Sequence, residues 1–219
     1  MDNYDTLDLT RLLNSIRTKL VGASEGGIKQ ELYETLHEFF KTTNTWKDWV
    51  QFTTRTGVNT YDLREGSITT PSGQPIRLVG VCDNSGYNVI SAMGVPPYIT
   101  LRDYPEPLLT YNAYVVFNVT MPVDACNNVP DFPQWVLPLH MDAITDGILG
   151  RMMGQTNKSF SDEAKSVYHL RRFRDLMAQA RVAALRDNTF GTNVWRFPQG
   201  FAARGQRGGV SVGSDLRFT

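Results

Sequence analysis

The clearest hydrophobic pattern in the chain lies between residues 133 and 186, where two apolar stripes flank a polar turn. The first stripe has steps of three and four residues and comprises Leu137, Met141, Ile144, Ile148 and Met152. The second stripe has the same spacing and comprises Leu170, Phe173, Met177, Ala180 and Ala184. This period is typical of amphipathic helices, and Ser161-Asp162-Glu163 offers an N-cap followed by acids in the first turn of the second helix. We therefore predict a helical hairpin.

Proline and glycine refine the first arm of this hairpin. Pro138 would disrupt a helix interior, because proline has no backbone N–H and clashes with the preceding turn. We therefore predict that the helix begins near Leu137, with Pro138 in its first turn. Gly147 and Gly150 each cost a helix about 0.5–1 kcal/mol relative to alanine, so we interpret them as sites where another backbone passes close by.

The N-terminal part of the chain shows the same helical period. A first helix is predicted over residues 7–21, capped by Asp5-Thr6, with an apolar stripe of Leu9, Leu12, Leu13, Ile16 and Leu20. After a break at residues 22–24, Ser24 or Gly26 opens a second helix that continues to about Thr42. Its predicted buried residues are Ile28, Leu32, Leu36, Phe39 and Phe40. The second helix is expected to lead directly into a sheet.

Between residues 46 and 130 the period changes to two, which is typical of β-strands. The clearest strand covers residues 111–120, with one face made of Tyr111, Ala113, Val115, Phe117 and Val119. Shorter strands are predicted over residues 50–54, 76–82 and 88–93; Gly57 and Asn59 mark turns around residues 58–63, and Pro96-Pro97 is interpreted as edge or loop. Eight of the eleven prolines fall between Pro71 and Pro130, which keeps the strands short and indicates a small antiparallel sheet or sandwich.

These patterns together predict an α+β fold. It would be a bundle of about four helices, two N-terminal and two C-terminal, with an inserted small antiparallel β-domain and an extended C-terminal arm. The predicted bounds are 1–45 for the N-terminal helices, 46–130 for the β-domain, 131–187 for the hairpin and 188–219 for the arm. The arm is rich in glycine and arginine but carries large apolar residues, so we expect it to become ordered on a partner.

Composition and charge narrow the class of protein. With 41% hydrophobic and 20% charged residues, the chain resembles an ordinary soluble protein, and no apolar run reaches the roughly 20 residues needed to span a bilayer. The N-terminus lacks the layout of a secretory signal, and Cys82 and Cys126 are interpreted as reduced thiols, with a disulfide as the alternative. Net charge is zero, but residues 161–219 carry +5 and residues 1–160 carry −5. This separation of acidic and basic residues favours docking on a surface of complementary charge. The alternative is that the charges are separated by chance and lie on solvated helix faces.

A search for catalytic or metal-binding patterns yields no active site. His140, Asp142 and Asp146 do not share one helical face, so a solvated or interface face is favoured over a metal site. Glu31, Glu34 and Glu38 form a row on the second helix that could run glycoside hydrolysis, but such a row is more often a solvated stripe. The basic run from His169 to Arg174 and the arginine-glycine elements of the arm could engage phosphates. Zero net charge argues against a dedicated nucleic-acid-binding protein. No cofactor or metal is expected.

The order of motifs over residues 7–186 resembles the head-to-tail adaptor (connector) proteins of short-tailed bacteriophages, the family similar to tail tubular protein A. The resemblance begins with the N-terminal helical pair, which ends in Leu36-His37-Glu38-Phe39-Phe40, and with a tryptophan-bearing segment from Trp46 to Trp49. It continues with Gly57-Val58-Asn59-Thr60-Tyr61-Asp62-Leu63. This motif is followed by Ile76-Arg77-Leu78-Val79. The hairpin, with its Asp142-Ala143-Ile144 and Asp146-Gly147-Ile148-Leu149 steps, completes it. Residues 84–109 do not align with the family pattern step by step.

The resemblance implies a structural virion protein that is not an enzyme. Such proteins form a ring, usually of twelve subunits, between the portal protein and a tail or nozzle protein, and the genome passes through the lumen, where it can contact the protein. On this basis we expect the arm to dock on the portal through Trp195, Phe197, Phe201, Arg204, Arg207 and Phe218. A subunit or partner interface is expected at Arg171, Arg174, Arg181 and Arg186. The alternatives are a cell-wall hydrolase, with the glutamates of the second helix as candidates, and a small nucleic-acid-binding module.

Overall fold

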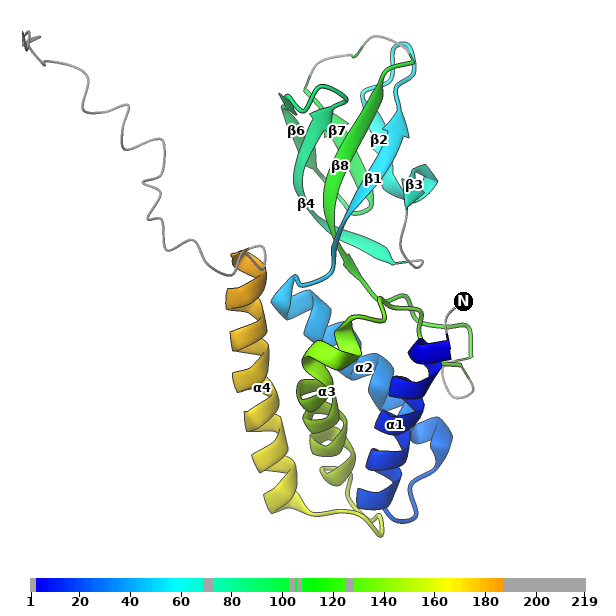
Figure 1. The fold of residues 1–219 in the computed structure, drawn as a ribbon, viewed down its shortest axis with the longest axis vertical. Helices are drawn as coiled ribbons and strands as arrows, with labels where there is room; N and C mark the ends of the chain where they lie inside the picture. The colour runs from blue at the N-terminus through cyan, green and yellow to red at the C-terminus, as the bar shows by residue number, and fades with distance from the viewer. Residues whose placement is uncertain (1–2, 69–72, 103–104, 106–107, 125–127, 187–219) are drawn as a thin grey trace, which may run out of the picture. The chain divides into compact units, whose positions relative to one another are not determined.

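The computed structural model of the chain describes residues 3–68, 73–102, 105, 108–124 and 128–186. The chain divides into two units, residues 1–188 and 189–219, and every helix and sheet below belongs to the first. Its described residues form four α-helices and two antiparallel sheets, which confirms the predicted α+β fold (Figure 1). The predicted arm, residues 188–219, lies outside the described residues.

The helices are α1 (Asn3–Lys19), α2 (Glu25–Thr43), α3 (Val136–Met153) and α4 (Glu163–Leu185). The prediction of residues 7–21 for the first helix was wrong at its start, because α1 begins at Asn3. Of the two predicted starts of the second helix, Ser24 and Gly26, the N-cap is Ser24. Its Oγ accepts a hydrogen bond from the Gly27 N–H at 3.2 Å. Asn44 ends α2 in a left-handed conformation, φ 54°, and its N–H bonds to the Phe40 carbonyl.

The bundle is organised around α3, which packs against each of the other three helices. Its predicted stripe is buried except for the half-buried Met141. The predicted apolar residues of α1, α2 and α4 also lie in or against the core, except Leu170, which is half-buried. Pro138 lies in the first turn as predicted. An additional kink occurs at His140, whose φ of −131° and ψ of 20° are not helical.

The two helical glycines mark close packing, as expected, but only one of them faces a backbone. A Cβ at Gly150 would lie 3.0 Å from the backbone nitrogen of Leu170 on α4. A Cβ at Gly147 would instead meet side chains, with the Thr35 Cγ2 of α2 at 2.4 Å and the Phe173 ring of α4 at 3.2 Å. Glycine therefore lets α2 and α4 approach α3 from two directions.

The larger sheet has five strands in the order β3-β1-β8-β4-β5. Its strands are β1 (Lys47–Thr53), β3 (Ser67–Ile68), β4 (Gln74–Asp83), β5 (Asn88–Val89) and β8 (Thr110–Asn118). The central strand β8 corresponds to the strand predicted over residues 111–120, and four of the five residues predicted for its inner face are buried, Tyr111 being half-buried. Val116 and Asn118, assigned by alternation to the other face, are also buried.

The smaller sheet has three strands in the order β2-β7-β6. They are β2 (Thr60–Asp62), β6 (Ser91–Met93) and β7 (Tyr98–Leu101). The single strand predicted over residues 88–93 was wrong, because β5 belongs to the larger sheet and β6 to the smaller one. Pro96-Pro97 lies in a turn, in agreement with the prediction of edge or loop. The strand β7, which begins at the next residue and is the central strand of this sheet, was not predicted.

Aromatic side chains join the sheets to each other and to the bundle. The rings of Phe52 on β1 and Tyr61 on β2 lie 5.0 Å apart, which links the two sheets across their shared core. Trp46, between α2 and β1, packs against Phe40 of α2 at 5.3 Å and Phe117 of β8 at 5.6 Å. One continuous cluster of buried side chains therefore runs from the helices into the β-domain.

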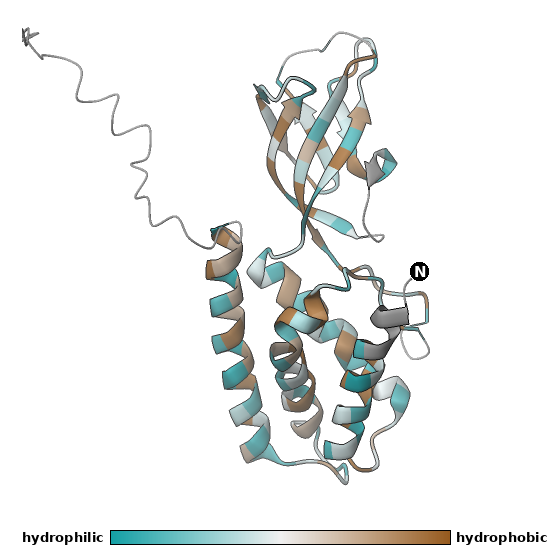
Figure 2. Ribbon diagram, in the orientation of Figure 1, coloured by the Kyte–Doolittle hydropathy of each residue, from teal (hydrophilic) through white to brown (hydrophobic). Residues whose placement is uncertain are grey.

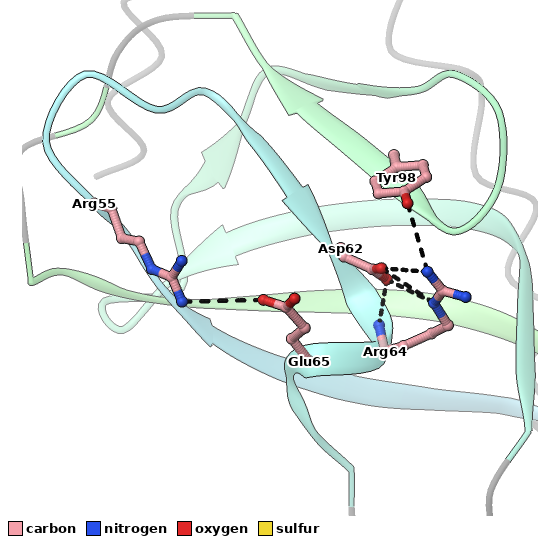
Figure 3. Close-up of polar contacts among 5 residues, drawn as sticks. All are labelled: Arg55, Asp62, Arg64, Glu65 and Tyr98. Carbon is pink, nitrogen blue, oxygen red and sulfur yellow. Dashed lines mark hydrogen bonds and ion pairs between the residues drawn. The ribbon is translucent and has the colours of Figure 1, made fainter.

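Charged side chains hold the surface turn that follows β2, as Figure 3 shows. Asp62 caps the short 3-10 helix η1 (Leu63–Glu65) by accepting a hydrogen bond from the Arg64 N–H at 2.9 Å. The Arg64 guanidinium also bonds to the Asp62 carboxylate, at 2.6 Å, and lies over the Tyr98 ring. Hydrogen bonding from Arg64 holds the pKa of Asp62 below its usual value. Nearby, Arg55 and Glu65 approach to 3.9 Å.

Replacing Gly147 with alanine should destabilise the protein by about 1–3 kcal/mol, although alanine is the better helix former, because the added methyl group has no room beside Thr35 and Phe173. Urea unfolding monitored by circular dichroism measures this change. Gly94→Ala is the control, since a Cβ there would meet no atom within 4 Å. Equal midpoints for the two variants would contradict the close packing at Gly147.

Candidate interaction surface on the last helix

Helix α4 is fixed on the bundle by its inner face and its N-cap. The inner face buries Phe173, Met177, Ala180 and Ala184 against the core. The sequence predicted Ser161 as the N-cap, but the N-cap is the next residue, Asp162. The Asp162 Oδ1 accepts a hydrogen bond from the Lys165 N–H at 3.0 Å. Ser161 instead donates its hydroxyl hydrogen to the Gln155 carbonyl.

Beside this buried face, one side of α4 carries a straight, exposed line of side chains, which we call the α4 stripe. It comprises Val167, Arg171, Arg174, Ala178, Arg181 and Leu185. The steps of four, three, four, three and four residues keep these positions on one side of the helix, as in a coiled-coil seam. Val167 is 62% exposed and Leu185 is 69% exposed, so apolar side chains lie at both ends of the stripe and arginines between them. Figure 2 shows polar and apolar residues alternating along α4.

Three of the four arginines predicted to form an interface fall in this stripe. Arg171, Arg174 and Arg181 are all exposed. Arg186 is also exposed but lies at the end of α4, where its backbone N–H bonds to the carbonyls of Val182 and Ala183. The structure therefore brings the first three together and places the fourth at the C-terminal cap. Sequence reasoning missed the apolar members of the stripe, although their spacing relative to the arginines is visible in the sequence.

Arg172, the remaining arginine of the run from His169 to Arg174, forms ion pairs with α3. Arg172 faces α3, where its Nε lies 3.0 Å from Asp146 Oδ2 and its Nη2 lies 3.8 Å from Asp142 Oδ2. The Nε–Oδ2 contact is an ion pair without the alignment of a hydrogen bond. His169 Nδ1 completes the cluster at 2.8 Å from Asp146 Oδ1. A hydrogen bond with Tyr168 and the nearby carboxylates raise the pKa of Arg172, so its guanidinium stays charged.

The sequence prediction of a solvated or interface face for Asp142 and Asp146 was therefore wrong for Asp146, which is 4% exposed. It was correct in separating His140 from them, because His140 packs against the Phe39 ring at 5.0 Å. Burial lowers the pKa of His140, which favours its neutral form. Among the residues that the structure describes, no group of three or more histidine, cysteine or acidic side chains could hold a metal ion.

The glutamates of α2, considered above for a hydrolase, connect α2 to α3. Glu38 forms an ion pair with Arg151, and Glu31 accepts a hydrogen bond from Gln155 Nε2 at 3.1 Å. Burial raises the pKa of Glu31, while Arg151 and Gln155 act in the opposite direction. The expectation of a solvated stripe was wrong for this row, since Glu31, Glu34 and Glu38 are all partly buried.

The residues predicted to dock on the portal all lie outside the described residues. They are Trp195, Phe197, Phe201, Arg204, Arg207 and Phe218. Cys126 also lies outside the described residues. Cys82 forms no disulfide with a described residue, and its Sγ lies 3.7 Å from the Asn112 carbonyl oxygen.

Comparisons with known proteins leave the family open: no family model matches the chain, and no curated protein matches it. None of the helices in the described residues has the length and apolar character required to cross a bilayer. The surface chemistry of the described unit is therefore the basis for a functional proposal.

Removing the carboxylate of Asp146 should destabilise the protein by about 1–3 kcal/mol, because the half-buried His169 and the exposed Arg172 would lose their shared partner between α3 and α4. We expect Asp146→Ala to lower the urea midpoint clearly. Asp142→Ala is the matched control, since Asp142 approaches the same arginine but its side chain is 80% exposed. Equal midpoint losses in the two variants would show that burial of the cluster contributes nothing.

Proposed function

We propose that this protein is a structural virion protein, a head-to-tail adaptor whose ring of subunits joins a portal to a tail or nozzle protein. The α4 stripe is the observation that carries the proposal. It presents three arginines and two exposed aliphatic side chains on one side of the helix that leads into the arm. This combination favours docking on another protein surface over a role inside the monomer.

The chemistry of the stripe defines the surface that it would meet. Val167 and Leu185 would bury apolar area at the two ends, and their exposure on an isolated chain is unfavourable. The arginines between them can form bidentate pairs with carboxylates, which fix the register of two helices. The partner would therefore be an acidic surface with apolar positions, on a neighbouring subunit or on the portal. Permanent assemblies of this kind bury roughly 2,000–5,000 Å² per interface.

The composition of the arm supports the same role. Residues 188–219 combine Trp195, Phe197 and Phe201 with Arg204 and Arg207, a pairing of aromatic and arginine residues that is enriched at protein interfaces. We propose that this arm docks on the portal. The β-domain would then contact the tail or nozzle protein, and the genome would pass through the ring.

Charge reversal in the α4 stripe should weaken assembly. For Arg171→Glu combined with Arg174→Glu, we expect at least a tenfold loss of affinity at low salt, because like charges would face each other across the interface. The loss should shrink as salt rises and screens the repulsion. Native mass spectrometry of the purified protein across a salt series measures the fraction in rings, and a pull-down measures portal binding.

Arg55→Glu is the matched control for this double variant, because Arg55 is an exposed arginine of the β-domain, outside the stripe. It should leave assembly intact. Unchanged assembly of the double variant, at every salt concentration, would remove the α4 stripe from the proposal.

A chain that ends at Asp187 should keep its fold but lose portal binding, because the described helices and sheets all precede that residue. Circular dichroism and thermal unfolding check the fold, and co-sedimentation with the portal protein of the same virus checks docking. A second chain, full-length but with Trp195→Ala and Phe201→Ala, separates loss of the aromatic contacts from loss of length. Normal docking of the shortened chain would refute the role of the arm.

A further inference from the structure

The outward face of the larger sheet carries an aromatic pair at its centre. The strand register aligns Trp49 of β1 with Tyr114 of β8, and Tyr114 with Gly80 of β4, so these three residues form one row across the sheet. The Trp49 and Tyr114 rings are stacked, with centroids 4.7 Å apart and planes 28° apart. Trp49 is 47% exposed, so much of its ring remains accessible beside Tyr114. A Cβ at Gly80 would meet no atom within 4 Å, so the row ends in open space.

The row on one side of this pair carries cations, and the row on the other side carries amides. On one side the register aligns Lys47 and Arg77 through β8, and Arg77 is exposed. On the other side it aligns Gln51 with Asn112, and Gln51 is exposed. These three rows of described residues contain two cations and no carboxylate, in a protein whose cations and carboxylates are equal in number. These rows therefore carry more cations than carboxylates, although the chain as a whole is neutral.

This combination identifies a class of ligand. An exposed indole offers a flat surface for a planar ring, a guanidinium in the neighbouring row suits a phosphate, and amides bond to the polar edges of bases. The absence of carboxylates from the three rows is favourable for a polyanion. Bases are available for stacking when they are unpaired, whereas a duplex keeps them inside its own stack. Single-stranded nucleic acid satisfies all of these conditions.

We propose that the outward face of β1, β8 and β4 binds single-stranded nucleic acid, with one base stacked on Trp49 and a neighbouring phosphate paired with Arg77. Tyr114 supports the indole from the opposite side. Gln51 and Asn112 lie within the same face and provide hydrogen bonds to base edges. This site is separate from the α4 stripe and does not depend on the proposed adaptor role.

The site adjoins the C-terminal end of α4. Lys47, in the basic row of the sheet, donates a hydrogen bond from Nζ to the carbonyl oxygen of Ala184 at 2.7 Å. The last turn of α4 therefore adjoins this row, and Arg186, which is exposed at the C-cap, lies two residues beyond Ala184 in the sequence. A strand bound at Trp49 can extend towards this arginine, and its affinity should fall as salt rises.

Binding of a fluorescent oligothymidylate of about 12 nucleotides to the full-length protein tests the proposal, with anisotropy as the readout. Wild-type protein should bind the single strand at least tenfold more tightly than a duplex of the same length. Trp49→Ala should weaken binding of the single strand about tenfold or more, and Trp49→Tyr should restore part of it, because the ring is kept. Trp135→Ala is the matched control, since Trp135 is a second exposed tryptophan, on another part of the chain.

Arg77→Ala should weaken binding and lower the slope of log affinity against log salt by about one, as expected for one lost phosphate contact. Arg55→Ala, an exposed arginine elsewhere on the β-domain, should leave the slope unchanged. The proposal is overturned if wild-type protein does not bind the oligothymidylate, if duplex binds equally well, or if Trp135→Ala weakens binding as much as Trp49→Ala. It is also overturned if Trp49→Ala leaves binding intact but reduces the mass of the assembled particle, because the face would then be a protein interface.

Discussion

The close approach of α4 to α3 is the constraint on which the rest of the helical architecture depends. At Gly150 the backbone of α4 lies within van der Waals distance of a position where any other residue would place a Cβ. Ser166 donates a hydrogen bond to the Gly150 carbonyl oxygen at 2.6 Å, and the Asp146 cluster adds a polar contact nearer the middle of both helices. These contacts fix α4 in one rotation about its own axis. The same rotation turns Val167, Arg171 and Arg174 to solvent and Arg172 towards Asp146.

A second dependence concerns the joint between the bundle and the β-domain. Trp46 packs between Phe40 and Phe117, and Lys47, the next residue, bonds to the end of α4. Since Lys47 also begins β1, this contact places the end of the last helix next to the first strand of the larger sheet. The alternation of β1 then sends Trp49 outward and Val50 into the core. The two proposed surfaces, one on a helix and one on a sheet, therefore depend on a few residues between Phe40 and Val50.

Much of the fold follows from local patterns in the sequence. The four helices and the central strand β8 have strong periods, and most of their buried apolar residues were predicted; Val116 of β8, which alternation assigned to the other face, is an exception. The strand β6 was wrongly joined to β5, and β7 was missed. Both strands are short, and a period-two pattern does not show where the chain passes from one sheet to the other. Asp146 was mispredicted for another reason. A carboxylate on a helix is usually solvated, and only the tertiary packing of α4 brings His169 and Arg172 to it.

The candidate surfaces were predictable only in part. The arginines of the α4 stripe were identified from charge, but the exposure of Val167 and Leu185 depends on how α4 is rotated against α3. The row of Trp49, Tyr114 and Gly80 joins residues far apart in the chain through strand register, which a single sequence does not specify. Their joint chemistry is therefore visible only in the folded sheet.

The insertion of the β-domain between α2 and α3 also affects the cost of bringing the helices together during folding. Residues 44–135 separate the two helices, and closing a flexible loop of that length costs about 4 kcal/mol in chain entropy. The ladder between β1 and β8 reduces this cost, because it pairs Lys47 with Val116 and so leaves only the shorter segments 44–46 and 117–135 to be closed. Contacts between the N-terminal and C-terminal helix pairs are thus favoured once that ladder exists. During synthesis, α1 and α2 can pack against α3 and α4 only after the β-domain has been made, because it lies between them in the sequence.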